Sequence, residues 1–372
     1  MNNSTAILVL VPIISFLLED EQELTSFECN SPTAEVGVVS HIEGEIVDDQ
    51  DIKIVGNFIC QPDNDPRPAF YFPLNGTIEL SPLGKQTELP GGNQTAAFAD
   101  DNELTPFGNA IGSMKYNIQP AGSNNGSSLT LGPFIIDNDF LMIAQPQYFN
   151  HDPFAEDGYN LKSWRMYHAD EEEILVNPNG SRTGTNTYKS GIQGFQHTEG
   201  ATGNKADYSS QNITPFVWQH HEWFFIGSDV EEVNGVTLNR LDGTMPDNMD
   251  EYRKTNTTEF PGPYRLLYFH QKSNGPQDGS ADNQLIYSGQ TIAYDVPHII
   301  WISDDADINN ATIREPLITK SWNKTEIVAK VRTGRFSDLN DAYLIITVGY
   351  QRGDLQDPKT AGYIQLPAIA LN

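Results

Sequence analysis

The chain has 372 residues, of which 50 are acidic and 22 basic, so its formal net charge is −28. Proteins bind nucleic acids chiefly through Lys and Arg side chains that neutralise phosphates, so this charge disfavours direct contact with DNA or RNA. The length permits two domains or one large β architecture.

The sequence begins with an apolar run, AILVLVPIISFLL, at residues 6–18. The run is shorter than the about 20 residues that a membrane-spanning helix needs. It also lacks the basic start and the small-residue cleavage site of a usual signal peptide. We interpret residues 1–27 as a retained apolar arm or strand, covered by the protein's own sheet or by a second copy. An atypical signal peptide and a membrane contact stay open as alternatives.

The chain contains two cysteines, Cys29 and Cys60. A disulfide between them would stabilise the fold by about 3–4 kcal/mol in the chain-entropy model. Two buried free thiols are equally consistent with the sequence. The cysteines therefore form a candidate disulfide and do not fix the compartment.

Sequons of the form Asn-x-Ser/Thr occur more often than the composition predicts, and such sequons are surface acceptors of N-linked glycans in secreted proteins. The candidate glycosylation sites are Asn75, Asn93, Asn125, Asn179, Asn212, Asn256, Asn310 and Asn323. We interpret this excess as a sign of an extracellular or virion location. A β protein that is merely rich in Asn and Thr would give the same pattern.

Short segments rich in β-branched and aromatic residues follow one another along the chain, separated by Gly, Pro, Asn and Asp. The first two, residues 34–47 and 52–60, flank an acidic turn and predict a hairpin. Further strands are expected at 69–72, 77–80, 114–118, 128–136, 140–149, 163–168, 173–176, 215–227, 235–241, 264–270, 284–294, 298–303, 325–332 and 342–350. Helical periodicity is confined to the opening segment and to residues 247–253.

This pattern predicts an all-β fold: an antiparallel β-sandwich that is jelly-roll-like, possibly two jelly rolls, with long loops. The longest polar stretch, residues 177–212, is predicted to be a loop and the boundary between domains. We therefore expect one β-sandwich at residues 28–195 and a second at 196–372.

The segment PFVWQHHEWFFIG, residues 215–227, has the densest cluster of polar and aromatic side chains. In a strand, His220 and Glu222 would lie side by side on one face, where they could share a metal ion or a proton. An aromatic core strand with hydrogen-bonded polar groups is the more ordinary interpretation.

Oxygen-bearing side chains alternate at Asp305, Asp307 and Asn309, as they do in calcium loops. The Gly at position six and the Glu at position twelve of an EF-hand are missing, so at most a looser calcium site is expected. Solvated loop carboxylates are the alternative. Calcium is the one cofactor that the sequence suggests.

Signatures of hydrolases, P-loop proteins and dinucleotide-binding proteins are missing. We therefore expect a non-enzymatic structural subunit of a virion, as a capsid or surface protein, or of another extracellular assembly built from copies of itself.

The alternative is a secreted glycoprotein that acts as a binding module or adhesin. Such a module would hold carbohydrate, with calcium or without, on exposed aromatic rings. The candidate rings are Trp164, Trp218, Trp223, Trp301 and Trp322. A secreted glycoside-acting enzyme is a third possibility, because it needs only two suitably spaced carboxylates.

Overall fold

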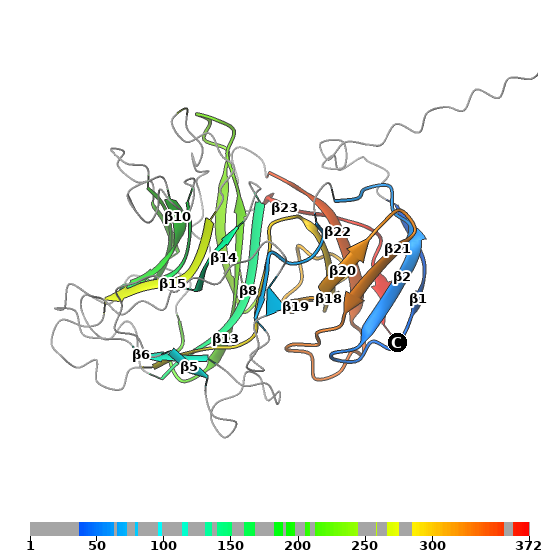
Figure 1. Ribbon diagram of the computed structural model, residues 1–372, viewed down its shortest axis with the longest axis horizontal. Helices are drawn as coiled ribbons and strands as arrows, with labels where there is room; N and C mark the ends of the chain where they lie inside the picture. Colours follow the sequence, from blue (N-terminus) through cyan, green and yellow to red (C-terminus); the bar gives the residue numbers. More distant parts are fainter. Residues whose placement is uncertain are drawn as a thin grey trace, which may run out of the picture.

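A computed structural model gives the three-dimensional arrangement of the chain (Figure 1). It describes residues 37–62, 65–72, 79–80, 96–98, 114–117, 131–135, 140–150, 160–167, 182–188, 191–197, 205–208, 213–244, 258, 266–274, 285–352 and 360–371. These residues form 24 β-strands in antiparallel sheets and no helix, which confirms the predicted all-β sandwich class. Within them, no helix has the length and apolar character needed to cross a membrane.

Two small sheets are formed by the two ends of the described chain. The four-stranded sheet has the order β1 (Val38–Glu43), β2 (Asp51–Asn57), β21 (Glu326–Lys330) and β20 (Ile318–Trp322). The five-stranded sheet has β19 (Arg314–Pro316), β18 (His298–Ser303), β22 (Tyr343–Gln351) and β23 (Gly362–Gln365), with β24 (Ile369–Ala370) also paired to β22.

Two larger sheets are formed mainly by the middle of the chain. The nine-stranded sheet contains β4 (Glu79–Leu80), β3 (Phe70–Phe72), β17 (Thr291–Tyr294), β8 (Phe140–Phe149), β16 (Leu285–Ser288), β6 (Met114–Asn117), β5 (Ala96–Phe98), β13 (Trp218–Ile226) and β14 (Val236–Leu241). The six-stranded sheet contains β12 (Lys205–Tyr208), β11 (Gly191–His197), β10 (Arg182–Tyr188), β9 (Asn160–Tyr167), β15 (Leu266–Asn274) and β7 (Leu131–Ile135).

The five-stranded sheet is buried on both faces, and strand β18 shows why. All six of its side chains are buried, and successive side chains on a strand point to opposite faces. Ile300 and Ile302 belong to the core shared with the four-stranded sheet, whereas Ile299 and Trp301 belong to the core shared with the nine-stranded sheet. The sheets therefore stack in layers, and Figure 1 shows the six-stranded sheet with β10 and β15 beyond β8 and β14.

The predicted N-terminal hairpin is confirmed. Strands β1 and β2 pair antiparallel, from Val38 opposite Asn57 to Glu43 opposite Lys53. Asp49 in the connecting turn has φ 66°, a left-handed conformation that Asp tolerates better than most residues. Figure 1 shows this hairpin beside β21 and β20, which come from the far end of the sequence.

The predicted loop at residues 177–212 is wrong, because three strands, β10, β11 and β12, lie within it. The hairpin pairs Arg182 with His197 through to Tyr188 with Gly191. The Gly and Asn residues of β10 and β11 have weak strand propensity, and pairing of the two backbones in the sheet outweighs that propensity.

Strands from both predicted halves share the sheets. β8 pairs with β13, β16 and β17, and β11 runs through residues 195 and 196. The division into separate units at 28–195 and 196–372 stays a prediction. The predicted arm at residues 1–27, the helical segment at 247–253 and Cys29 lie outside the described residues. Assembly of copies through that arm also stays a prediction.

His298 in β18 makes stability depend on pH. Its ring is buried, and neither nitrogen has a hydrogen-bond partner among the described residues. The ring packs edge-on against Trp322, with ring centroids 5.4 Å apart. Burial lowers the pKa of His298 from 6.5 to about 3. Between pH 6.5 and about 3, His298 is protonated in the unfolded chain but neutral in the folded protein. The unfolding free energy therefore decreases as the pH falls towards 3.

We therefore expect the unfolding free energy to lose up to about 1.4 kcal/mol per pH unit through this one group. His298→Phe should reduce the slope by one proton, because it keeps an aromatic ring beside Trp322 and removes the titration. Urea unfolding between pH 3 and 7 measures the slope. The exposed His41 supplies the control His41→Gln. Equal slopes for wild type and His298→Phe would refute this assignment.

Candidate functional site

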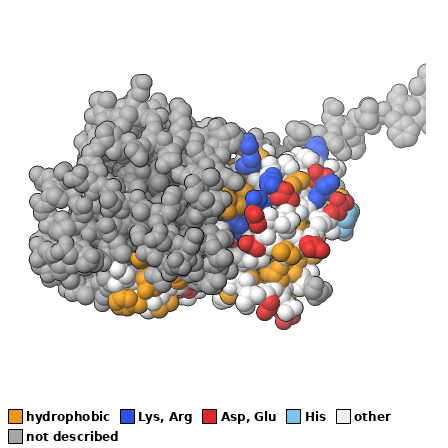
Figure 2. All heavy atoms as spheres, turned by 60° about the horizontal axis from the view of Figure 1, so that its bottom comes forward, with side chains coloured by type: hydrophobic (Ala, Val, Ile, Leu, Met, Phe, Trp, Pro, Cys, Tyr) orange, Lys and Arg blue, Asp and Glu red, His pale blue; other side chains and the backbone are white. Residues whose placement is uncertain are grey.

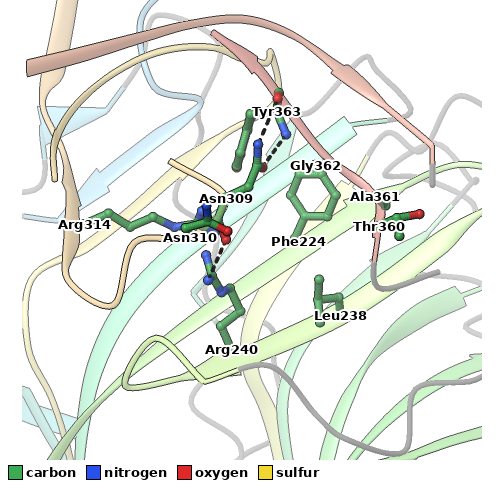
Figure 3. Close-up of a pocket in the computed structure, with 10 residues that line it drawn as sticks. All are labelled: Phe224, Leu238, Arg240, Asn309, Asn310, Arg314, Thr360, Ala361, Gly362 and Tyr363. Carbon is green, nitrogen blue, oxygen red and sulfur yellow. Dashed lines mark hydrogen bonds between the residues drawn. The ribbon is translucent and has the colours of Figure 1, made fainter. Parts of the chain in front are cut away.

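A pocket opens where the nine-stranded and five-stranded sheets meet (Figure 3). The lining comes from β13, β14, β19, β23, the segment just before β23 and the loop between β18 and β19. The cavity has a volume of about 240 Å³. Its lining residues are Phe224, Leu238, Arg240, Asn309, Asn310, Arg314, Thr360, Ala361, Gly362 and Tyr363. Two of the side chains are guanidinium groups, so the electrostatics of the pocket depend on their partners.

Arg314 is fully paired. Its Nε donates to Glu222 Oε2 at 2.8 Å, its Nη2 donates to Glu222 Oε1, and its Nη1 donates to Ile308 O at 2.6 Å. Burial is the largest single influence and would raise the pKa of Glu222, but the charge and hydrogen bonds of Arg314, together with the charges of Arg240 and Arg335, outweigh it and lower the pKa. This bidentate pair joins β13 to β19, and so it ties the nine-stranded sheet to the five-stranded sheet.

Arg240 is buried and has only backbone oxygens as partners within the described part of the chain. Its side chain is 5% exposed, and its Nη2 donates to the carbonyl oxygens of Asn309 and Ala311, each at 3.2 Å. Among the described residues, its Nε has no hydrogen-bond partner. The largest favourable charge effect on it comes from Glu222, whose carboxylate is paired with Arg314. Burial, followed by the charge of Arg314, lowers the pKa of Arg240 to about 10. The guanidinium is therefore still charged at neutral pH.

Tyr363 lines the same pocket. Its ring packs against Phe224 at 5.2 Å and Trp301 at 5.4 Å between centroids, and the guanidinium of Arg314 lies 5.5 Å from its centre. The hydroxyl is buried without a hydrogen-bond partner among the residues that the structure describes. Burial, and then the charge of Glu222, raises the pKa of Tyr363 well above its usual range. The hydroxyl is therefore protonated at neutral pH and can act as a hydrogen-bond donor.

The rim of the pocket is held by Asn309. Its Oδ1 accepts the Tyr363 N–H at 2.9 Å, and its Nδ2 donates to Tyr363 O at 3.2 Å. Gln365 holds the same loop by accepting the Ile308 N–H at 2.8 Å and donating to Ala306 O at 2.7 Å. The loop is therefore fastened to β23 along its length.

Gly362→Ala should loosen this rim. A Cβ at Gly362 would lie 2.4 Å from Asn309 Oδ1, so Asn309 would have to leave its two bonds with Tyr363. We expect a loss of about 1–3 kcal/mol of unfolding free energy, typical of overpacking, measured by urea unfolding. The double variant Gly362→Ala with Asn309→Ala removes the clashing amide, and the alanine at position 362 should then cost little more than Asn309→Ala alone. An unchanged stability for Gly362→Ala would contradict the clash.

The predicted pair His220 and Glu222 does lie on one face of β13, but among the described residues the two side chains lie against different partners. Glu222 is taken by Arg314, and His220 Nδ1 lies 4.0 Å from Glu315 Oε1. Burial, and then the charges of Arg335 and Arg332, hold the pKa of His220 well below its usual value. Within the described residues no group of three or more His, Cys, Asp or Glu could hold a metal ion.

The three calcium candidates lie together on the loop before β19. Asp305 Oδ1 accepts the Asp307 N–H at 2.8 Å, and Asp307 Oδ1 accepts the Asn309 N–H at 3.0 Å. Asn309 Oδ1 is already bonded to β23. These oxygens serve the loop's own turns, and calcium binding stays a prediction that a calcium titration of thermal stability would test.

The remaining candidates have mixed outcomes. Cys60 is buried and disulfide-bonded, and its predicted partner Cys29 lies outside the described residues, so their pairing stays a prediction. Asn310 and Asn323 are exposed, and the other six sequons lie outside the described residues. The predicted sugar-binding role of exposed Trp side chains is not supported for Trp223, Trp301 and Trp322, which are at most 9% exposed.

Arg240, Arg314 and Tyr363 were not predicted from the sequence. Each is an ordinary strand residue with no motif around it. The available signal was the occurrence of Arg at an inward position of a strand, because buried Arg needs partners.

Neither a protein-family model nor a curated protein matches the chain. Solved structures of similar fold include an alginate lyase from Chlorella virus, with 12% identity, a TM-score of 0.39 and coverage of 54% of this chain and 89% of the other. An endo-β-1,4-glucuronan lyase from Trichoderma reesei shows 8% identity, a TM-score of 0.40 and coverage of 61% and 95%. An alginate lyase from Aplysia kurodai shows 9% identity, a TM-score of 0.39 and coverage of 53% and 86%.

These neighbours correct our expectation of function. They are enzymes that act on polysaccharides and not shell subunits, so the predicted non-enzymatic structural subunit of a virion or capsid is not upheld. The likeness itself is one of fold, and any chemistry of this chain has to be argued from its own residues.

Proposed function

We propose that the protein is a carbohydrate-active enzyme that acts on an acidic polysaccharide, and that Arg240 binds a sugar carboxylate in the pocket. The observation that carries the proposal is a buried guanidinium beside a cavity of about 240 Å³, with an Nε that has no partner in the described part of the chain. A buried charge without a counter-ion is costly. A ligand carboxylate would supply the missing counter-ion.

The charges around the pocket support an anionic ligand. Glu222 pairs with Arg314, and Glu315 accepts from Arg335 Nε at 2.8 Å. Each of these pairs is neutral, which leaves the charge of Arg240 in excess. His220 adds no negative charge and, with its depressed pKa, stays neutral in the physiological range.

The rest of the lining favours a sugar as the carrier of that charge. Asn310 and Thr360, both exposed at the mouth, offer amide and hydroxyl groups to sugar hydroxyls. Phe224 and Leu238 offer apolar surface to the C–H groups of a ring. Because ligand pockets usually measure roughly 300–1,000 Å³, this cavity suits one sugar unit of a chain that continues outside.

Such a pocket assists cleavage by elimination. When a carboxylate is held by a cation, the carbon beside it gives up a proton more readily, because the cation stabilises the negative charge that develops. In this proposal solvent water at the open mouth of the pocket accepts that proton. The electron pair then forms a carbon–carbon double bond as the glycosidic oxygen leaves. We assign to Tyr363, which lines the pocket and keeps its proton, the donation of a proton to that leaving oxygen, after which its hydroxyl is reprotonated from solvent.

Long-range electrostatics do not help the protein to attract a polyanion. The net charge is −28, and Figure 2 shows acidic side chains interspersed with basic ones on one face of the described part. Repulsion between exposed charges is screened within about 8–10 Å at physiological salt. The proposed recognition therefore acts at contact, inside the pocket.

The test uses a uronic-acid polymer and the same polymer with its carboxyl groups reduced to alcohols. We expect ultraviolet absorbance from an unsaturated sugar product with the acidic polymer and none with the reduced one. Equal cleavage of both polymers, or no binding of either, would refute the proposal. Binding of the acidic polymer without cleavage would refute the enzymatic part alone.

A further inference from the structure

The sequon Asn310-Ala311-Thr312 lies on the rim of the pocket. Asn310 lines the cavity and is exposed to solvent, and Figure 3 places its side chain beside Arg240 and Arg314. We propose that an N-linked glycan on Asn310 closes the pocket, so that occupancy of this sequon switches off ligand binding. The inference rests on the proposed function of the pocket.

The folded loop can carry a glycan at this position. Asn310 Nδ2 donates to Asp307 Oδ2 at 3.3 Å, and a glycosylated amide keeps one N–H for that bond. Thr312 is also exposed, and its N–H donates to Asp304 Oδ1 at 2.9 Å. Ala311, the middle residue of the sequon, is buried, but the glycan would be attached to the exposed Asn310 and not to Ala311. Folding therefore does not require the modified side chain to be buried.

The loop cannot carry an attached glycan away from the pocket. Arg240 bonds the carbonyl oxygens on either side of Asn310, at Asn309 and Ala311. Gly243 packs so tightly against the loop that a Cβ there would lie 2.2 Å from Thr312 O. Together with the bonds to β23, these contacts fix the root of the glycan at the mouth of the pocket. A cavity of about 240 Å³ has no room for an oligosaccharide of several units beside a ligand.

A second sequon provides a matched control. Asn323-Lys324-Thr325 lies in the turn between β20 and β21, with Asn323 exposed. Its Oδ1 accepts the N–H groups of Thr325 at 2.9 Å and of Glu326 at 3.0 Å. This turn belongs to the four-stranded sheet, on the opposite side of the five-stranded sheet from the pocket. A glycan there leaves the pocket open.

The experiment compares full-length wild type made in a glycosylating secretory host with the same chain made in bacteria. Peptide mass spectrometry gives the occupancy of Asn310 and Asn323, and titration with a uronic-acid oligosaccharide gives affinity. We expect the form occupied at Asn310 to bind about tenfold more weakly or worse than the bacterial form. Thr312→Ser keeps the sequon and the hydroxyl, so this variant made in the secretory host should still bind the oligosaccharide weakly. Asn323→Gln should change nothing, and Asn310→Gln should remove the difference between hosts.

The outcomes separate this inference from the function on which it rests. If the bacterial protein binds and the form occupied at Asn310 binds equally well, the inference is wrong and the proposed function stands. The inference is also wrong if Asn323 is occupied in the secretory host and Asn310 never is. If the bacterial protein does not bind the oligosaccharide, the proposed function fails and the inference falls with it.

Discussion

Arg314→Met should lower the free energy of unfolding by about 3–5 kcal/mol, the usual cost of leaving one member of a buried ion pair alone. Glu222 is 3% exposed and receives two N–H groups from Arg314. Without them its buried carboxylate would lose its hydrogen-bonded charge partner, between two sheets that the pair holds together. Urea unfolding at neutral pH measures the loss.

Two matched variants show whether this loss of unfolding free energy comes from the unpaired charge of Glu222. Arg352→Met removes the partly exposed pair with Asp229, whose N–O distance is 3.0 Å, and should cost at most about 1 kcal/mol. Arg314→Met combined with Glu222→Met removes both charges and should recover much of the stability. A loss below about 1 kcal/mol for Arg314→Met alone would mean that the pair does not join the sheets.

Arg240→Met should abolish most ligand affinity while leaving the fold almost as stable as before. A buried charge pair across an interface costs about 2–5 kcal/mol when one partner is removed, which corresponds to a loss of about 30-fold to several thousand-fold in affinity for a uronic-acid oligosaccharide. Stability should change little, because the two bonds lost to backbone carbonyls are offset by removal of a buried charge that has no counter-ion among the described residues.

This contrast between two neighbouring arginines distinguishes a binding residue from a structural one. Arg240→Lys, which keeps the charge but loses the planar fork, should retain only part of the affinity. Titration calorimetry measures the affinity, and urea unfolding of the same variants measures stability. If Arg240→Met destabilised the protein as much as Arg314→Met and bound the ligand normally, Arg240 would be a structural residue.

Local pattern was a good guide wherever neighbouring residues determine the structure. The alternation in β13 correctly placed His220, Glu222 and Phe224 on one face, and the acidic turn correctly predicted the first hairpin. The strands β10 to β12 were missed because their Gly, Asn and Gln residues look like loop residues, and only pairing with neighbours makes them strands. Propensity at one position cannot report such pairing.

The pocket could not be predicted for a different physical reason. Arg240 meets Asn309 across 69 residues of sequence, and Arg314 meets Glu222 across 92. Which charges are left unpaired depends on these long-range contacts. The excess positive charge at Arg240 is also hidden in a chain whose net charge is −28. Periodicity finds the buried face of a strand but not the partner that its charge will meet.

A crystal structure of the protein with a uronic-acid oligosaccharide would test the role of Arg240 most directly. We expect a sugar carboxylate in the pocket, with an oxygen within hydrogen-bond distance of Arg240 Nε and a sugar oxygen near the Tyr363 hydroxyl. An oligosaccharide bound elsewhere on the protein, with Arg240 untouched, would contradict the proposed recognition.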